Sequence, residues 1–334
     1  MNQTKRLIHI DIIAGIMILR MIIGHCTYFS QQGIPFFFLL SFYMPWFYYK
    51  SGMLFHPNNQ ADLYKKDIYK FLRYFVVYSF IGWCIWAVCG IVDSSLTIIS
   101  CMILPMKVFF HSGCISANGA LWFLLSLFLV RQIGNFILNK TKLPPPFVSF
   151  LCFAIAFLLY VVGWYNYSWW FGNLFSGLCF FLLGYWLKNK EQNRLLFLIS
   201  TIIYLLVVFA FFADVIDGFP YLYMHANNMY SGSYLLFYPM SLAGIIMTNN
   251  LFRVLSKHVR FYILQYIGRN SMNFYVTHWI LFVLVTFVSK FIFRVNSSAI
   301  LFWALLCSSI IFLPLISKSI DSIKIHNKIL NNIL

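Results

Sequence analysis

The sequence predicts an all-α fold: a polytopic integral membrane bundle of about ten transmembrane helices. Of the 334 residues, 61% are hydrophobic and only 10% are charged, whereas soluble domains carry about 25% charged residues. The mean hydropathy is +0.79, and apolar runs of about 20 residues, long enough to cross a bilayer, recur along the chain. This composition excludes a water-soluble enzyme. The 38 Phe and 21 Tyr residues exclude a disordered chain.

Ten apolar runs are the expected membrane spans. They lie at about 7–29, 34–55, 71–92, 119–138, 146–165, 169–187, 195–213, 233–251, 271–292 and 297–317. Pro45 is expected to kink the second run. A shorter stretch, 95–111, contains Pro105 and Lys107 and is expected to be interfacial or re-entrant. We therefore assign residues 1–318 to a single integral-membrane domain and 319–334 to a short cytoplasmic tail.

The distribution of charge predicts the orientation. The chain has 24 Lys and Arg, eight Asp and Glu, and a formal net charge of +16. With the N-terminus in the cytoplasm, 19 of the 24 Lys and Arg fall on the inner side and three on the outer side, as the positive-inside rule requires. Both termini are therefore expected to be cytoplasmic. We attribute the positive charge to topology and to contact with the anionic lipid bilayer, and expect no nucleic-acid partner.

The eight cysteines lie mostly inside apolar runs, without a CxxC pair or a Cys/His spacing typical of a metal site. They are interpreted as small buried side chains, and no metal is expected. Only Cys101 and Cys114 lie near one expected external loop, so a disulfide between them stays open.

Ionisable residues inside a membrane are costly, which makes them functional candidates. The first run contains Asp11, Arg20 and His25. His25 shares a helical face with Asp11 and lies about 25 Å from the start of the run, near the outer half of the membrane. Taken alone, a histidine in this position is more often a hydrogen-bonded structural histidine than a catalyst.

The second run and the segment after it are unusually basic. Lys50 near the inner end either snorkels or contacts a substrate, and Ser51 precedes a glycine that permits close backbone approach. Lys66, Lys70 and Arg73 form one basic helical face. That face serves either topology and lipid anchoring or the docking of a polyanionic cofactor.

The ninth run begins with polar residues that cannot face lipid. Asn270 precedes Ser271, Tyr275 and His278, and the last three share one helical face. This face lines a cavity or packs against other polar helices. Trp122, just inside the fourth run, is typical of an aromatic belt at the membrane interface.

Several strings together resemble the bacterial membrane acyltransferase type 3 family, which includes polysaccharide O-acetylases, O-succinylases and fucose 4-O-acetylase-like proteins. The strings, in the order expected for that family, are Asp11 with Ala14, Gly15, Gly24 and His25; Met44–Phe47 followed by Ser51–Phe55; a basic patch and aromatic helix at 65–78; Leu121–Leu124; Leu182–Asn189; and Ile267, Gly268, Asn270, Ser271, Tyr275 and His278. The resemblance spans nearly the whole chain.

The resemblance implies a function. It implies an O-acyltransferase of the bacterial inner membrane that moves an acyl group, acetyl in the first instance, from cytoplasmic acetyl-CoA or another acyl-CoA to a hydroxyl of an extracytoplasmic or lipid-linked sugar or polysaccharide of the cell envelope. His25 maps onto the family's proposed catalytic histidine. Lys50, Lys66, Lys70 and Arg73, with Arg20, are the expected cofactor-binding cations. The expected supporting residues are Asp11, Ser51, Trp122, Asn270, Ser271, Tyr275 and His278. A glycan-synthesis complex is a further expected partner.

One departure from the family pattern is important. The family has a basic residue eleven positions before the catalytic histidine, and Ala14 stands there in this chain. We hypothesise that Lys50 or Arg20 relocates the missing charge. The alternative function is a glycan or small-molecule transporter, or export component, without chemistry.

Overall fold

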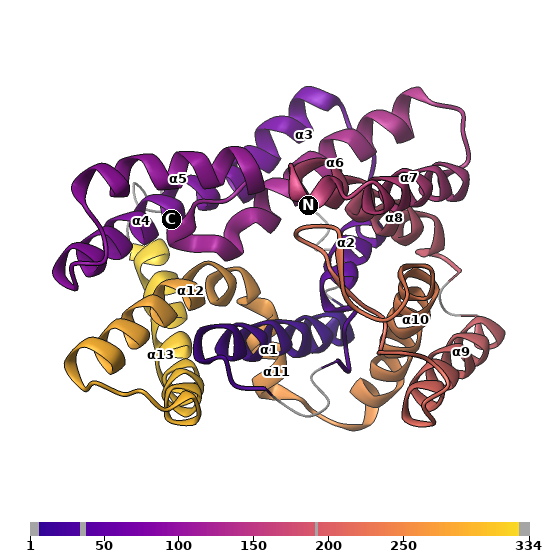
Figure 1. The fold of residues 1–334 in the computed structure, drawn as a ribbon. Coiled ribbons are helices and arrows are strands. Elements are labelled where there is room, and N and C mark those ends of the chain that lie inside the picture. The colour runs from indigo at the N-terminus through magenta and orange to yellow at the C-terminus, as the bar shows by residue number, and fades with distance from the viewer. Residues whose placement is uncertain (1–6, 34–37, 191–192, 327–334) are drawn as a thin grey trace.

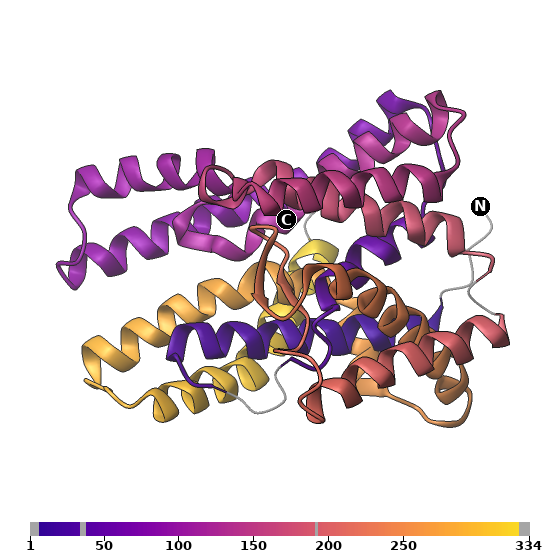
Figure 2. The same cartoon turned by 45° about the vertical axis from the view of Figure 1, so that its right-hand side comes forward.

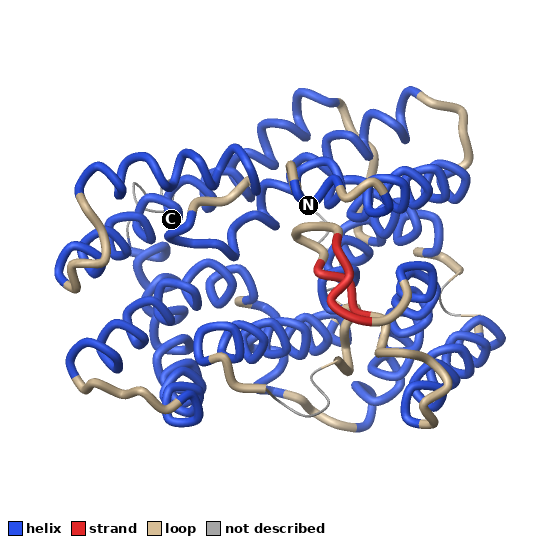
Figure 3. The backbone as a smooth tube through the Cα atoms, viewed as in Figure 1, coloured by secondary structure: helices blue, strands red, loops and turns tan. Residues whose placement is uncertain are grey.

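The computed structural model describes residues 7–33, 38–190 and 193–326, and over these the chain is almost entirely helical (Figure 3). The helices are α1 (Ile8–Ser30), α2 (Tyr43–Met53), α3 (Gln60–Asp67), α4 (Arg73–Val92), α5 (Ile98–Ser112), α6 (Trp122–Lys140), α7 (Pro145–Val161), α8 (Trp170–Leu187), α9 (Arg194–Phe212), α10 (Tyr234–His258), α11 (Tyr262–Arg269), α12 (Ser271–Phe287) and α13 (Ser298–His326). One hairpin joins the strands β1 (Tyr221–Tyr223) and β2 (Asn228–Ser231).

The apolar runs coincide with helices, which makes this a multi-pass membrane protein. Within the described residues, eight helical stretches are long and apolar enough to cross a membrane. The runs assigned to α2 and α7 form helices of only 11 and 17 residues. Helix α13 continues past residue 318 to His326, and residues 327–334 lie outside the described part of the chain.

The second run does not form a single helix. Residues 38–42 form turns, helix α2 begins only at Tyr43, and residues 34–37 lie outside the described residues. The expected kink at Pro45 is also wrong. Pro45 lies in the first turn of α2, where backbone N–H groups have no partner inside the helix, so a proline there costs nothing.

The stretch around Pro105 is joined to the fourth span. Helices α5 and α6 belong to one apolar helical stretch, Ile98–Lys140, which is broken by a 3-10 turn at Ser116–Leu121. Pro105 is buried within α5. Cys101 and Cys114 are both free and buried, so no disulfide joins them.

The helices pack in two groups with α2 between them (Figure 1). Helices α3–α8 form one group, and α1 with α9–α13 forms the other. Glycines allow the closest approaches. A side chain at Gly268 of α11 would collide with the backbone of Asp11 in α1, and one at Gly184 of α8 would collide with the backbone of Tyr49 in α2. Small residues of this kind bring membrane helices into backbone contact.

Connections lie at two opposite ends of the molecule (Figure 2). The turns between α4 and α5 and between α12 and α13 lie at one end, and the α6–α7 and α8–α9 connections lie at the other. This separation is what alternating membrane crossings require. It agrees with the positive-inside assignment, in which the α6–α7 and α8–α9 connections are cytoplasmic and basic.

The β1–β2 hairpin was not predicted from the sequence. Its strands pair antiparallel between Tyr221 and Ser231. Alternation along β1 buries Leu222 while Tyr221 and Tyr223 point to the other face. Asn227 has a positive φ of 51° in the connecting turn, a backbone conformation that asparagine adopts readily.

Candidate active site

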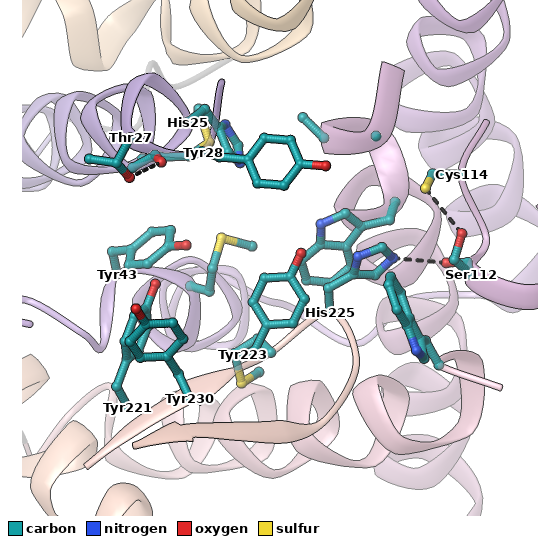
Figure 4. A pocket seen from close by; sticks show the side chains of 18 of the residues that line it. His25, Thr27, Tyr28, Tyr43, Ser112, Cys114, Tyr221, Tyr223, His225 and Tyr230 are labelled. Atoms are coloured by element: carbon teal, nitrogen blue, oxygen red, sulfur yellow. Dashed lines mark hydrogen bonds between the residues drawn. The ribbon is translucent and has the colours of Figure 1, made fainter. Parts of the chain in front are cut away.

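A large cavity lies between the last turns of α1, helix α5, the start of α6 and the hairpin (Figure 4). Its volume is about 1210 Å³. Aromatic side chains dominate its wall: Tyr28, Tyr43, Trp122, Trp169, Tyr221, Tyr223, Tyr230 and Trp279. We call it the aromatic cavity. Lys107 is the one Lys, Arg, Asp or Glu among its described lining residues, so this space suits an aromatic-stacking, largely uncharged ligand.

His25 faces this cavity from α1 and is hydrogen-bonded to a second histidine. Its Nδ1 lies 2.8 Å from Nε2 of His278 on α12, and the two ring planes lie within 7° of parallel. His278 is fully buried and does not line the cavity, whereas His25 is partly exposed. Trp279 packs edge-on against His25. The two histidines, 253 positions apart in the sequence, therefore act as one unit.

The hydrogen bonds determine which nitrogens carry protons. Nδ1 of His278 lies 2.7 Å from the carbonyl oxygen of Tyr275 and 3.2 Å from that of Phe274. A carbonyl only accepts, so His278 carries its proton on Nδ1, and in the neutral ring its Nε2 accepts. The shared bond must then be donated by Nδ1–H of His25. This leaves Nε2 of His25 as the unprotonated nitrogen, the form that a general base or nucleophile requires.

The hairpin contributes a third histidine that the sequence analysis did not select. His225 projects into the aromatic cavity, and its Nε2 donates to the carbonyl oxygen of Ser112 at 3.0 Å. Its ring stacks on Trp122, with centroids 4.7 Å apart, and meets Trp169 edge-on at 4.2 Å. Burial lowers the pKa of His225 to about 3. His225 is therefore a neutral part of the aromatic wall, and Trp122 is its stacking partner.

A second cavity of about 390 Å³ lies toward the N-terminal half of α1. We call it the basic cavity, because Lys50, Lys66, Lys70, Arg131 and Arg269 line it. Asp11 is the one acidic side chain among its described lining residues. The structure thus gathers three of the predicted cations, from α2 and the α3–α4 segment, around one space with two arginines that the sequence analysis did not select.

Arg131 is held firmly in the basic cavity. Its Nε donates to the fully buried carboxylate of Asp67 at 2.8 Å, and Nη1 donates to Ser51 at 3.2 Å. The guanidinium also lies over the rings of Phe55 and Phe71, at 5.0 and 5.6 Å. Ser51 thus positions a cation. The sequence contains a feature that could have identified Arg131 as a site residue, because it is a lone arginine in the fourth apolar run.

Arg269 of α11 places a cation beside Asp11 of α1. Its Nε lies 3.3 Å from the carboxylate of Asp11. Ala14 is fully buried. Lys50 lies in the same cavity, whereas the Arg20 guanidinium lies over the rings of Tyr43 and Tyr221, at 5.0 and 5.8 Å, on the aromatic side. The structure therefore places Lys50, and not Arg20, among the basic-cavity cations.

The other predicted site residues divide between the two cavities and their surroundings. Ser271 lines the basic cavity, and Tyr275 lines both cavities while donating its hydroxyl hydrogen to the carbonyl oxygen of Ala120. Arg73 and Asn270 line neither. Asn270 donates to the carbonyl oxygen of Tyr266 and so supports the α11–α12 junction.

The two cavities adjoin along α1. Asp11, Ile18 and Met21 face the basic cavity, whereas Met21, His25 and Gln31 face the aromatic one. Asp11 and Gln31 are about 30 Å apart along a helix axis, which matches the thickness of the hydrocarbon core. Within the described residues, no group of three or more His, Cys, Asp or Glu side chains could hold a metal ion.

Residues 7–318 match the model of a family described as an acyltransferase domain. The chain belongs to the membrane acyltransferase type 3 family. It is therefore a membrane acyltransferase, and the family favours acyl transfer over the transport alternative. No curated protein and no solved structure matches the chain.

Proposed function

We propose that this membrane acyltransferase moves an acyl group from cytoplasmic acyl-CoA, with acetyl-CoA as the first candidate, to a hydroxyl group of a sugar or polysaccharide on the outer side of the membrane. One observation carries the proposal. The His25–His278 pair lies beside the junction of a basic cavity and an aromatic cavity. A basic site suits the phosphates of coenzyme A, and an aromatic site suits a sugar ring.

The basic cavity is the proposed donor site. The nucleotide and its phosphates cannot enter hydrocarbon, so they stay at the inner surface with Lys50, Lys66, Lys70, Arg131 and Arg269. Arg131 is held by Asp67, and Arg269 lies beside Asp11. Their planar guanidinium groups can each donate two parallel hydrogen bonds to a phosphate. The slender pantetheine arm then extends along α1 toward His25.

In the proposed reaction, His25 is the general base. Nε2 of His25 takes the proton of an acceptor hydroxyl while that oxygen attacks the thioester carbonyl carbon. The C–O bond forms, the C–S bond breaks, and the imidazolium returns its proton to the departing thiolate. His278 accepts from Nδ1–H throughout, which holds the ring and stabilises its positive charge. The alternative route forms an acyl-histidine on Nε2, which the hydroxyl then attacks.

The aromatic cavity is the proposed acceptor site. Trp122 and Trp169, joined through His225, form a continuous aromatic wall on which a sugar ring can stack. Gln31, Gln32 and Ser231 supply polar groups at the same cavity. At about 1210 Å³ the cavity exceeds the roughly 300–1,000 Å³ typical of pockets for small-molecule ligands, so it has room for a sugar. A cytoplasmic N-terminus would place it on the outer side of the bacterial inner membrane.

The test uses the full chain purified in detergent. Acetyl-CoA is supplied with a panel of methyl glycosides, and release of free coenzyme A and acetylation of the glycoside are measured. We expect His25→Ala to lower both rates at least about 100-fold, the usual contribution of a general base. His9→Ala is the matched control, because His9 is on the same helix and lines neither cavity. Equal rates in wild type and His25→Ala would contradict the proposal.

The donor site can be tested with a matched pair of lysine variants. Lys66 lines the basic cavity and Lys65, its neighbour in α3, does not. Lys66→Gln should raise KM for acetyl-CoA about 10-fold, because one charge-assisted hydrogen bond is lost. Lys65→Gln should leave KM unchanged. The same KM in both variants would place the donor phosphates elsewhere.

A further inference from the structure

Three side chains separate the two cavities. Among the described lining residues, Met21 of α1, Met44 of α2 and Tyr275 of α12 line both. They come from three helices and lie where the basic and aromatic cavities adjoin. All three are buried, with exposures of 3, 6 and 6%. We call this group the neck.

The neck lies next to the histidine pair, because two of its residues are one helical turn from His25 and His278. Met21 lies one helical turn from His25 on α1, about 6 Å along the axis. Tyr275 lies one turn before His278 on α12, and its backbone carbonyl accepts the proton of His278 Nδ1. Anything that travels from the basic cavity to His25 therefore passes these side chains first.

The neck has one rigid side and two adaptable ones. The hydroxyl of Tyr275 donates to the carbonyl oxygen of Ala120, and its ring packs edge-on against Phe123. Met21 and Met44 are unbranched and flexible, so their side chains can move aside for a narrow, apolar acyl chain. The neck itself presents two thioethers and one phenol, and none of these three side chains carries a charge.

From this geometry we infer that Met21, Met44 and Tyr275 form a filter that admits only small, uncharged acyl groups to His25. The inference rests on the proposed function, in which the phosphates stay in the basic cavity and the acyl group leads the pantetheine arm through the neck. An acetyl or propionyl group passes at little cost. A succinyl or malonyl group brings a carboxylate into an apolar constriction, and burying an unpaired charge there is strongly unfavourable.

A branched or longer acyl group meets a steric limit at the same place. Closely packed side chains tolerate added methylenes poorly, and one methylene in an apolar pocket changes selectivity about 10- to 200-fold. Shortening Met21 and Met44 to alanine removes most of the apolar atoms that narrow the passage. The charge barrier stays, because no cation is added.

The experiment measures coenzyme A release by the full chain in detergent from acetyl-, propionyl-, butyryl-, isobutyryl- and succinyl-CoA, each supplied with the same panel of methyl glycosides as acceptors. For the wild type we expect turnover of acetyl-CoA and propionyl-CoA, slow turnover of isobutyryl-CoA, and background rates with succinyl-CoA. The Met21→Ala/Met44→Ala variant should raise the butyryl-to-acetyl ratio of kcat/KM about 10-fold or more. Met44→Phe should lower the propionyl-to-acetyl ratio. Met17→Ala is the matched control: Met17 is buried one turn before Met21 and lines neither cavity.

The outcomes separate the filter from the proposed function. If wild type turns over succinyl-CoA as fast as acetyl-CoA, or if the alanine variant turns over acetyl-CoA with an unchanged butyryl ratio, the filter is wrong and the acyltransferase function stands. If wild type turns over none of the thioesters, the proposed donor is wrong. Thermal unfolding of each variant identifies loss of fold, and in that case the Met44→Phe ratio decides the filter.

Discussion

At the scale of single residues, the proposed mechanism depends on which ring nitrogen of His25 carries the proton. His25 donates through Nδ1 to His278, and His278 donates to the carbonyl of Tyr275, so the basic nitrogen of His25 is Nε2. The sequence pattern predicted His25 and the polar character of the ninth run. It could not predict the bond between His25 and His278, because a contact across 253 positions depends on how α1 and α12 pack. Arg269 and His225 escaped selection for the same reason, whereas Arg131 was recognisable as a lone arginine in the fourth apolar run.

A substitution at His278 tests its positioning role. His278→Leu should lower kcat for acyl transfer about 100-fold or more with KM for acetyl-CoA nearly unchanged, since the tautomer of His25 is no longer fixed. His278→Gln should restore part of the rate, because its side-chain oxygen can accept from Nδ1–H of His25. A purely structural role predicts no such rescue, so equal rates for the two variants would refute the assignment. The pH dependence of kcat, shifted in the leucine variant alone, is the second readout.

At the scale of elements, helix formation was readily predicted, and apolar runs of suitable length identified the helices. The separation of α5 from α6 also follows the expected stretches 95–111 and 119–138. The start of α2 at Tyr43 and the β1–β2 hairpin were not predicted, because they depend on tertiary contacts. The hairpin brings His225 against Trp122, which no local pattern encodes.

The α1–α11 contact can be tested with a matched pair of glycines. Gly268 packs against the backbone of Asp11, whereas a Cβ at Gly33 would meet nothing within 4 Å. Gly268→Val should destabilise the fold by about 1–3 kcal/mol or more, because the two helices must separate. Gly33→Ala should leave the thermal unfolding midpoint within about a degree. Similar midpoints for both variants would show that the contact is not close.

The hairpin should respond to acid through His225. Its pKa of about 3 lies below the ordinary value of 6.5, so the unfolded chain binds this proton more readily than the folded one. Stability should therefore fall as pH drops from about 6.5 toward 3. His225→Phe keeps the stacking on Trp122 and removes the titration, so its thermal midpoint should decline less steeply between pH 6.5 and 4. Parallel declines in the two proteins would contradict this.

At the scale of the whole molecule, two cavities of different chemistry are arranged along one helix. The basic cavity lies toward the N-terminal half of α1, and the aromatic cavity lies toward its C-terminal half. In the proposed function, with the N-terminus expected in the cytoplasm from the charge distribution, donor and acceptor approach His25 from opposite sides. The composition predicted the membrane protein, and the orientation inferred from the charge distribution stays a prediction. The cavities themselves could not be predicted, because each is lined by residues from several helices.

Sidedness of catalysis in membrane vesicles tests this central claim most directly. Sealed vesicles are prepared with the cytoplasmic face outward or inward, and both kinds contain methyl glycosides on both sides of the membrane. Radiolabelled acetyl-CoA is added on the outside, and acetyl transfer to the glycosides is measured for wild type and His25→Ala. The account predicts transfer only by wild-type vesicles with the cytoplasmic face outward, and none by His25→Ala. Transfer by vesicles of the opposite orientation, or undiminished transfer by His25→Ala, would contradict it.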